Sequence, residues 1–216
     1  MIADSATQKN IDSIIKKALP QATSYEVYRN LVRELAESEN TTGEKTEAYV
    51  GYTLLNNKRM KRWDKTLRLS DEQEQEIKAF GGKLIWLVLT ESWCGDAAPI
   101  LPAMNKIASL NQGIELRILL RDEQPELMDH FLTRGARSIP KLIILDAITM
   151  EVIGEWGPRP GIAAQMVRDY KEEHGKLTAE FKEALQNWYN KDKGQSALKE
   201  LIELLALENI GDSSDL

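Results

Sequence analysis

Residues 84–98 read LIWLVLTESWCGDAA, and this stretch decides the fold. Its first six residues are apolar without alternation, as in a central strand that helices cover on both faces. The polar and small residues that follow indicate a helix from about Cys94 to Leu110, bent at Pro102. A thiol at a helix amino terminus faces unpaired amides and the positive end of the helix dipole, which favour the thiolate. Cys94 is therefore either a reactive nucleophile or a small buried hydrophobe.

Three further strands are indicated downstream of this stretch. Residues 115–120 form the second strand, and a short helix follows over 127–131. Residues 141–145 and 151–156 lie too close together for a crossover helix, so these two strands are expected to be antiparallel. A helix over 162–174 closes the unit. This order predicts an α/β fold with a mixed four-stranded sheet flanked by helices.

Helical patterns lie on both sides of this α/β unit. The additional helices are predicted over residues 11–19, 25–35, 49–63, 70–80, 181–189 and 198–205. We therefore divide the chain into a helical N-terminal extension (1–80), an α/β domain (81–175) and C-terminal helices packed on the core (176–216). Residues 211–215 are expected to fray.

The composition restricts the class of protein. The chain has 216 residues, of which 42% are hydrophobic and 29% charged, and this balance argues against a disordered chain, a collagen-like repeat and a membrane protein. The net charge of −6 gives no reason to expect nucleic acid or an anionic membrane as a partner. A single cysteine excludes an intramolecular disulfide and suits a reducing compartment. Because Asp4 stands where an export signal needs basic residues, we expect a cytoplasmic protein.

Four landmarks follow one another across residues 83–175: Trp93-Cys94-Gly95 after a core strand, Pro102, Arg137-Ser138-Ile139-Pro140 before the next strand, and Trp156-Gly157 after the hairpin. In this order and at these distances they resemble the thioredoxin family. The resemblance implies a thioredoxin-like fold with added terminal helices, a cis peptide between Ile139 and Pro140, and a nucleophilic Cys94. It also implies that a partner is bound by Trp93, Gly95, Asp96, Ile139, Pro140 and Gly157. Residues 52–62 further resemble the basic stretch of an uncharacterised bacterial branch of that family, one with a helical N-terminal extension.

Three departures from the family pattern change the expected chemistry. Ala97 occupies the position of the second cysteine, so a mixed disulfide cannot be resolved within the chain. Asp96 replaces the usual proline, and its carboxylate opposes formation of a nearby thiolate. Val88 replaces the buried acid that the family carries six residues before the first cysteine. These departures exclude a dithiol Cys-x-x-Cys reductase.

Two functions from different classes remain. The first is a monothiol oxidoreductase whose partners are protein thiols or disulfides: Cys94 attacks a partner disulfide, and an external low-molecular-weight thiol, such as glutathione, resolves the mixed disulfide. The alternative is a non-catalytic thioredoxin-fold module whose groove recognises a protein. In both cases no cofactor is expected.

Other ligand classes have weaker support. Cys94, His130 and His174 do not stand at a zinc-ligand spacing, so no metal site is expected. The sequence from Cys94 to Ala97 also lacks the Cys-Gly-Phe-Ser motif of proteins that share an iron-sulfur cluster. A basic cluster surrounds Trp63, and we interpret it as a solvated helix face rather than a nucleic-acid site. The cluster comprises Lys58, Arg59, Lys61, Arg62, Lys65 and Arg68, with Glu200, Glu203 and Glu208 as its expected acidic counterpart.

Overall fold

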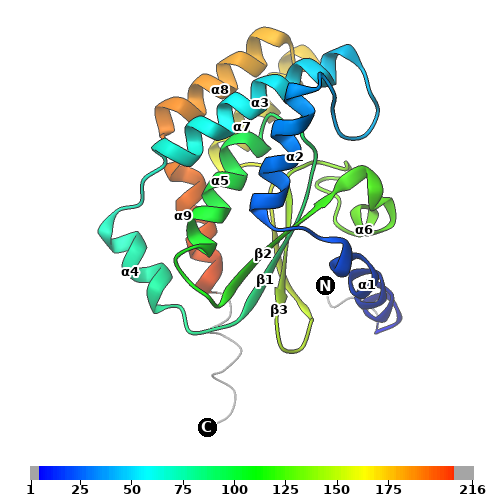
Figure 1. Ribbon diagram of the computed structural model, residues 1–216, viewed down its shortest axis with the longest axis vertical. Coiled ribbons are helices and arrows are strands. Elements are labelled where there is room, and N and C mark those ends of the chain that lie inside the picture. The colour runs from blue at the N-terminus through cyan, green and yellow to red at the C-terminus, as the bar shows by residue number, and fades with distance from the viewer. Residues whose placement is uncertain (1–4, 207–216) are drawn as a thin grey trace.

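The computed structural model describes residues 5–206, with side chains from residue 9 onward. Its centre is a four-stranded sheet in the order β2-β1-β3-β4 (Figure 1). The strands are β1 (Leu84–Thr90), β2 (Ile114–Leu120), β3 (Lys141–Asp146) and β4 (Val152–Trp156). β1 pairs in parallel with β2 and antiparallel with β3, and β3 pairs antiparallel with β4. The predicted mixed α/β sheet is confirmed, and the fold is thioredoxin-like.

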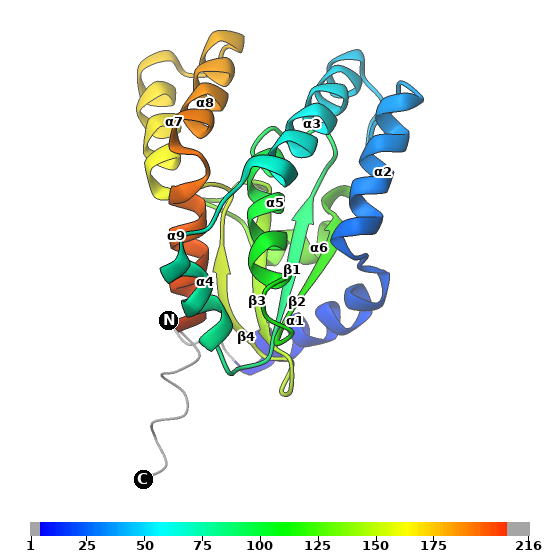
Figure 2. The same ribbon diagram turned by 60° about the vertical axis from the view of Figure 1, so that its left-hand side comes forward.

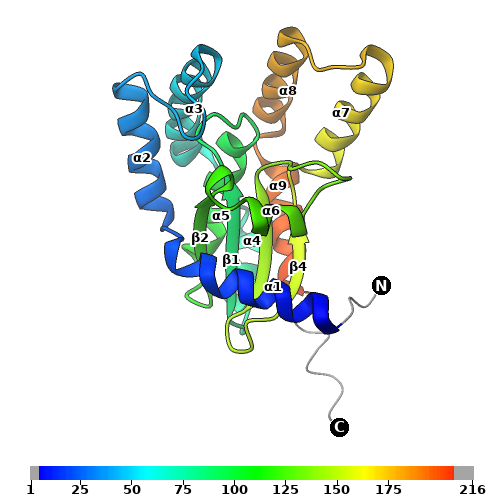
Figure 3. The ribbon, with the colours of Figure 1, turned by 90° about the vertical axis from the view of Figure 1, so that its right-hand side faces the viewer.

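Strand β1 is buried along its whole length because helices cover both faces of the sheet. Figures 2 and 3 show α1 (Ser5–Ala18) and α6 (Pro125–His130) on one face and α5 (Ala97–Ala108) with α9 (Gln195–Glu203) on the other. We expected the helix over 162–174 to close the unit. Instead, α7 (Gly161–His174) packs against α8 (Ala179–Asp192), while α9 packs beside α5.

The N-terminal extension forms α1, α2 (Tyr25–Glu37), α3 (Glu47–Thr66) and α4 (Asp71–Ala79). The hydroxyls of Ser24 and Thr46 cap α2 and α3, and a capping box of Ser70 and Gln73 opens α4. Before α2, Thr23 exchanges two backbone hydrogen bonds of 2.8 Å with Ile118, so the extension also pairs with the outer edge of β2. The extension is thus built into the sheet as well as packed on it.

Helix α5 begins later than the sequence indicated. Cys94 lies three residues before the first helical residue, in a turn where its N–H donates to the carbonyl of Glu91 (3.1 Å). The predicted start at Cys94 was therefore wrong. Pro102 lies inside α5, as expected. Short 3-10 helices occur at Leu19–Gln21 and Arg121–Glu123.

One hydrophobic core contains residues from the extension, the sheet and the C-terminal helices. Its largest fully buried side chains include Tyr28 of α2, Trp86 of β1 and Tyr189 of α8. Beyond the carboxyl end of β1, α2 with α3 and α7 with α8 project as two helix pairs (Figure 3). No helix within residues 5–206 is both long and apolar enough to cross a membrane. The prediction that residues 211–215 fray concerns a segment outside the described residues.

Candidate functional site

The loop after β1 is fastened to the N-terminal extension through Ser92. The Ser92 hydroxyl accepts a hydrogen bond from the Thr42 N–H (3.0 Å) and lies 2.8 Å from the Thr53 hydroxyl. The Thr41 hydroxyl is 3.3 Å away, and Asn56 donates to the Ser92 carbonyl (3.0 Å). All five residues are buried. Because the extension satisfies these polar groups, it fixes the backbone that carries Cys94.

Two residues of α3 in this network escaped the sequence interpretation. The buried face of α3 carries Thr53, Asn56, Met60 and Trp63, at successive spacings of three and four residues. Thr53 and Asn56 lie within residues 52–62, which the sequence analysis interpreted only as a basic stretch. Two polar residues on an otherwise apolar helical face were the available signal, because a buried polar group needs a specific partner.

Trp93 is also held by its own chain. Its ring stacks on that of Tyr49, with centroids 4.4 Å apart and planes inclined by 7°. The guanidinium of Arg121 lies over the same ring, 5.0 Å from its centroid. These contacts join the loop to α3 and to the end of β2, so Trp93 packs within the chain.

Cys94 lies beside the peptide that the sequence associated with it. The Ile139–Pro140 peptide is cis, and the Cys94 thiol donates to the Ile139 carbonyl at 3.2 Å. Cys94 is only 7% exposed, and Ile139 is 6% exposed. Both the thiol and the neighbouring backbone acceptor are therefore covered and already paired with each other.

The electrostatic surroundings keep this thiol protonated. Burial, followed by the Asp96 carboxylate, raises the pKa of Cys94 to about 12. The N–H groups of Ala97 and Asp96 and the charge of Arg159 lower the pKa, but by less in total. As expected, the Asp96 carboxylate opposes formation of the Cys94 thiolate. The amides at the helix amino terminus favour the thiolate, as expected, but desolvation of the charged sulfur outweighs them and the net pKa of Cys94 is raised.

Asp96 belongs to a buried polar cluster built from three separate segments. Its Oδ2 accepts from Arg159, through Nε at 3.1 Å and through a shorter bond from Nη2. Its Oδ1 accepts from the hydroxyl of Tyr189 at 3.0 Å. The side chains of Asp96 and Arg159 are 11% and 18% exposed. The carboxylate thus has its hydrogen-bond partners inside the protein.

Helix α8 covers the loop from the side opposite the extension. Tyr189 reaches Asp96, and the Gln186 amide donates to the Gly95 carbonyl at 3.0 Å. Sequence interpretation placed Tyr189 in the predicted helix over 181–189 and did not single out Gln186 or Arg159. Arg159 stands between Pro158 and Pro160, and a cation fixed by two prolines was the one local signal for it.

Gly157 packs directly on Pro140. The Gly157–Pro158 peptide is cis and the φ angle of Gly157 is 116°, a region that side chains rarely adopt. A Cβ at this position would lie 2.3 Å from the Pro140 carbonyl oxygen. Only glycine permits this close approach of two backbones.

Glu91 is a further buried group that the sequence did not highlight. It is fully buried, and its Oε1 accepts from the N–H of Asp122 at 2.9 Å. Burial raises the pKa of its carboxyl group. Its position one residue after a central strand was the only sequence signal.

Metal-ligating side chains do not gather in the part of the chain that the structure describes: residues 5–206 contain no group of three or more such residues. The prediction that Glu200 and Glu203 face the basic cluster was wrong. Glu200 accepts from the Trp156 indole (2.9 Å) and the Gly161 N–H (2.8 Å), and Glu203 pairs with Lys199. Glu208 lies outside the described residues.

The mixed sheet, the cis peptide before β3 and a cysteine beside it define a thioredoxin-like protein. A family model described as thioredoxin matches residues 43–173, more than half of the chain, and the chain belongs to this family. The match begins within the N-terminal extension, so the family's own pattern includes α3.

Two solved structures share the fold. A Pseudomonas aeruginosa protein of unknown function superimposes with a TM-score of 0.55 at 20% identity, over 88% of this chain and 99% of that one. An HIV epitope-scaffold gives a TM-score of 0.53 at 21% identity, over 87% and 98% of the two chains. Curated proteins gave no match. At these identities the likeness concerns the fold alone.

Proposed function

We propose that this chain is a non-catalytic thioredoxin-fold module that binds a protein partner, and that Cys94 is a structural thiol. The observation that carries the proposal is the Cys94 thiol itself, which is buried, donates to the Ile139 carbonyl and has a pKa of about 12. Because the thiolate is the nucleophile in thiol-disulfide exchange, a thiol with this pKa is nearly inert at neutral pH.

The groups expected to form a partner groove are used within the chain. Gly95 accepts from Gln186, Asp96 is paired with Arg159, and Ile139 accepts from Cys94. A partner segment would have to displace these contacts to reach the groove. A protein partner is therefore expected to bind the helical additions rather than the groove around Cys94.

A turnover assay tests the absence of catalysis. The wild type and Cys94→Ser are compared in the reduction of a low-molecular-weight disulfide with added glutathione. We expect both proteins to match the rate of glutathione alone. Ala97→Cys is a matched control for the wild type, because it restores the second thiol of the Cys-x-x-Cys motif and leaves Cys94 in place. Turnover by the wild type that disappears in Cys94→Ser would overturn the proposal.

The monothiol oxidoreductase is the second candidate, and one observation favours it. Cys94 lies against the cis Ile139–Pro140 peptide, where a partner backbone would present its sulfur. In that reaction the thiolate attacks one sulfur of a protein disulfide, and the departing sulfur leaves as a thiolate. Glutathione thiolate then attacks the mixed disulfide, which releases Cys94 and leaves glutathione bonded to the other sulfur.

The second candidate requires α8 to move away from the loop. Tyr189→Phe with Gln186→Ala removes two of the hydrogen bonds between α8 and the loop. If the chain works as a monothiol enzyme, this variant accelerates both Cys94 alkylation and disulfide turnover. Faster alkylation without turnover would favour the non-catalytic module.

A further inference from the structure

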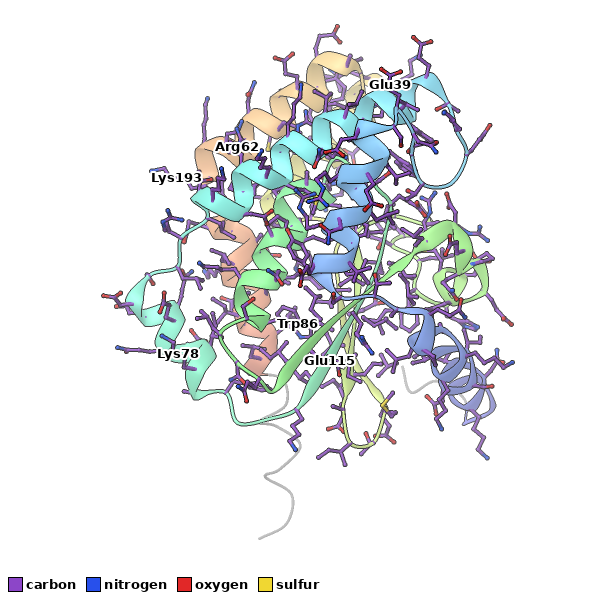
Figure 4. The ribbon with its side chains drawn as sticks, in the orientation of Figure 1. Glu39, Arg62, Lys78, Trp86, Glu115 and Lys193 are labelled. Atoms are coloured by element: carbon purple, nitrogen blue, oxygen red, sulfur yellow. The ribbon has the colours of Figure 1, made fainter. Side chains whose placement is uncertain are left out.

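A cavity of about 370 Å³ lies where the carboxyl end of α3 meets the turn between α8 and α9. Its volume is within the range of small-ligand sites, roughly 300–1,000 Å³. Figure 4 labels two of its residues, Arg62 on α3 and Lys193 after α8. The cavity is lined by Arg62, Trp63, Thr66, Arg68, Asn190, Lys193 and Gln195.

The charge of the lining is entirely positive. Three of the seven lining residues are cationic and none is acidic. Across residues 5–206, no carboxylate forms an ion pair with Arg62, Arg68 or Lys193. Arg62 donates to the side-chain oxygen of Asn190, which orients its guanidinium toward the α8 side. Three cations without acidic partners leave a positive potential at the cavity.

The helix ends at the cavity explain only part of this charge. Arg68 donates to the carbonyls of Lys65 and Leu67, which is a usual role for a cation after a helix. Arg62 and Lys193 make no such bond to a carbonyl among the described residues. Helix α9 begins at Gln195 after Gly194, but the Asp192 carboxylate already accepts from the Ser196 N–H (3.0 Å), so the positive end of this helix is compensated by an acid of its own chain and adds nothing to the cavity.

The lining of the cavity also includes one aromatic residue, Trp63, which is almost fully covered. Trp63 is 4% exposed, and the Arg62 guanidinium lies 5.4 Å from its ring centroid. The Trp63 indole N–H has no hydrogen-bond partner among the described residues. Gly194 fits closely against this lining, because a Cβ there would come within 2.7 Å of Leu67 and 3.4 Å of Trp63. The turn that carries Lys193 is therefore fixed against the ring.

We propose that this cavity binds a small organic phosphate. The planar fork of an arginine matches two oxygens of a phosphate, and a lysine adds a point charge. A dianion suits several cations better than a single carboxylate does. The volume leaves room beside the phosphate for a small organic group. This inference goes beyond the proposed function and does not depend on the state of Cys94.

Calorimetric titration of the full chain tests the site with three probes: phenyl phosphate, inorganic phosphate and succinate. We expect phenyl phosphate to bind most tightly and the binding to weaken as salt increases. Arg62→Gln and Lys193→Gln should each weaken it about tenfold or more, as expected for a charge-assisted hydrogen bond. Lys58→Gln is the matched control, because it removes the same charge from an exposed position of α3 outside the cavity.

Each outcome decides the proposal. Weaker binding in both cavity variants, with Lys58→Gln unchanged and all variants equally folded by circular dichroism, supports it. Equal weakening in Lys58→Gln would show attraction by the overall basic face and overturn the site. Tighter binding of succinate would overturn the phosphate class. If inorganic phosphate binds as tightly as phenyl phosphate, the organic part of the proposal is wrong. If none of the three probes binds, the whole proposal is overturned.

Discussion

Replacing Arg159 by glutamine should destabilise the protein strongly, because it leaves the Asp96 carboxylate without its cation. The Asp96 and Arg159 side chains are 11% and 18% exposed, so little solvent is available to take the place of the lost partner. Removing one partner of a buried ion pair costs about 3–5 kcal/mol, and the bond from Tyr189 and the residual exposure place this pair near the lower end, about 3 kcal/mol.

Urea unfolding followed by far-UV circular dichroism measures this loss. With a slope of about 2 kcal/mol per M, a loss of about 3 kcal/mol lowers the midpoint by about 1.5 M. Arg137→Gln is the matched control, since Arg137 forms a two-bond pair with Asp129 in which both side chains are about half exposed. Surface pairs of this kind contribute little.

The double variant Asp96→Asn with Arg159→Gln separates the ion pair from other effects. If the unpaired carboxylate causes the loss, the double variant is less destabilised than the sum of the two single variants. A midpoint for Arg159→Gln equal to that of Arg137→Gln would refute the reasoning, because the cluster would then be no better protected from solvent than a surface pair.

Three further predictions follow from the site. The pKa of Cys94 is about 12 in the fold and about 8.5–9 when unfolded, so only the unfolded chain loses this proton as pH rises past about 9. The stability of the wild type relative to Cys94→Ser should therefore fall by about 1.4–1.9 kcal/mol between about pH 8 and 10 in urea titrations, and a constant difference would contradict this prediction. Gly157→Ala should lower stability by about 3 kcal/mol through the 2.3 Å clash with Pro140 and the positive φ, and an unchanged melting temperature would count against that packing. Ser92→Ala should lower the free energy of unfolding by about 3 kcal/mol because it leaves buried donors without an acceptor, whereas Ser109→Ala, at an exposed position, should lower it far less. Similar losses in the two variants would show that the hydrogen-bond network around Ser92 does not stabilise the fold.

The fold was largely predictable from local patterns. The unbroken apolar run of β1 and the paired strands β3 and β4 indicate the mixed sheet without further information. What periodicity could not indicate is which helix packs beside α5, because α7 and α9 both have one apolar face. Tertiary packing alone places α9 there.

The contact between Cys94 and the cis peptide was predictable from the sequence, but the protonation state of Cys94 was not. The motif around Cys94 and Pro140 correctly predicted that Cys94 lies beside the Ile139–Pro140 peptide, and this peptide is cis. The pKa of Cys94, however, depends on how deeply α8 and the extension bury it. Tyr189 and Arg159 are 95 and 65 residues away in the chain, and no spacing rule connects residues that far apart. Desolvation is a property of the assembled fold, so the helix-dipole argument alone gave the wrong sign.

The rate of Cys94 alkylation as a function of pH tests the central claim most directly. The chain has one cysteine, so iodoacetamide labelling reports this thiol without ambiguity. At neutral pH the native thiolate fraction should be about a thousandfold or more below that of a free cysteine. The native rate should therefore rise without a plateau up to pH 10, while the urea-unfolded chain shows a plateau with a pKa near the ordinary value, about 8.5. A native inflection below pH 8, with a rate equal to that of the unfolded chain, would contradict the buried, protonated thiol and favour the monothiol enzyme.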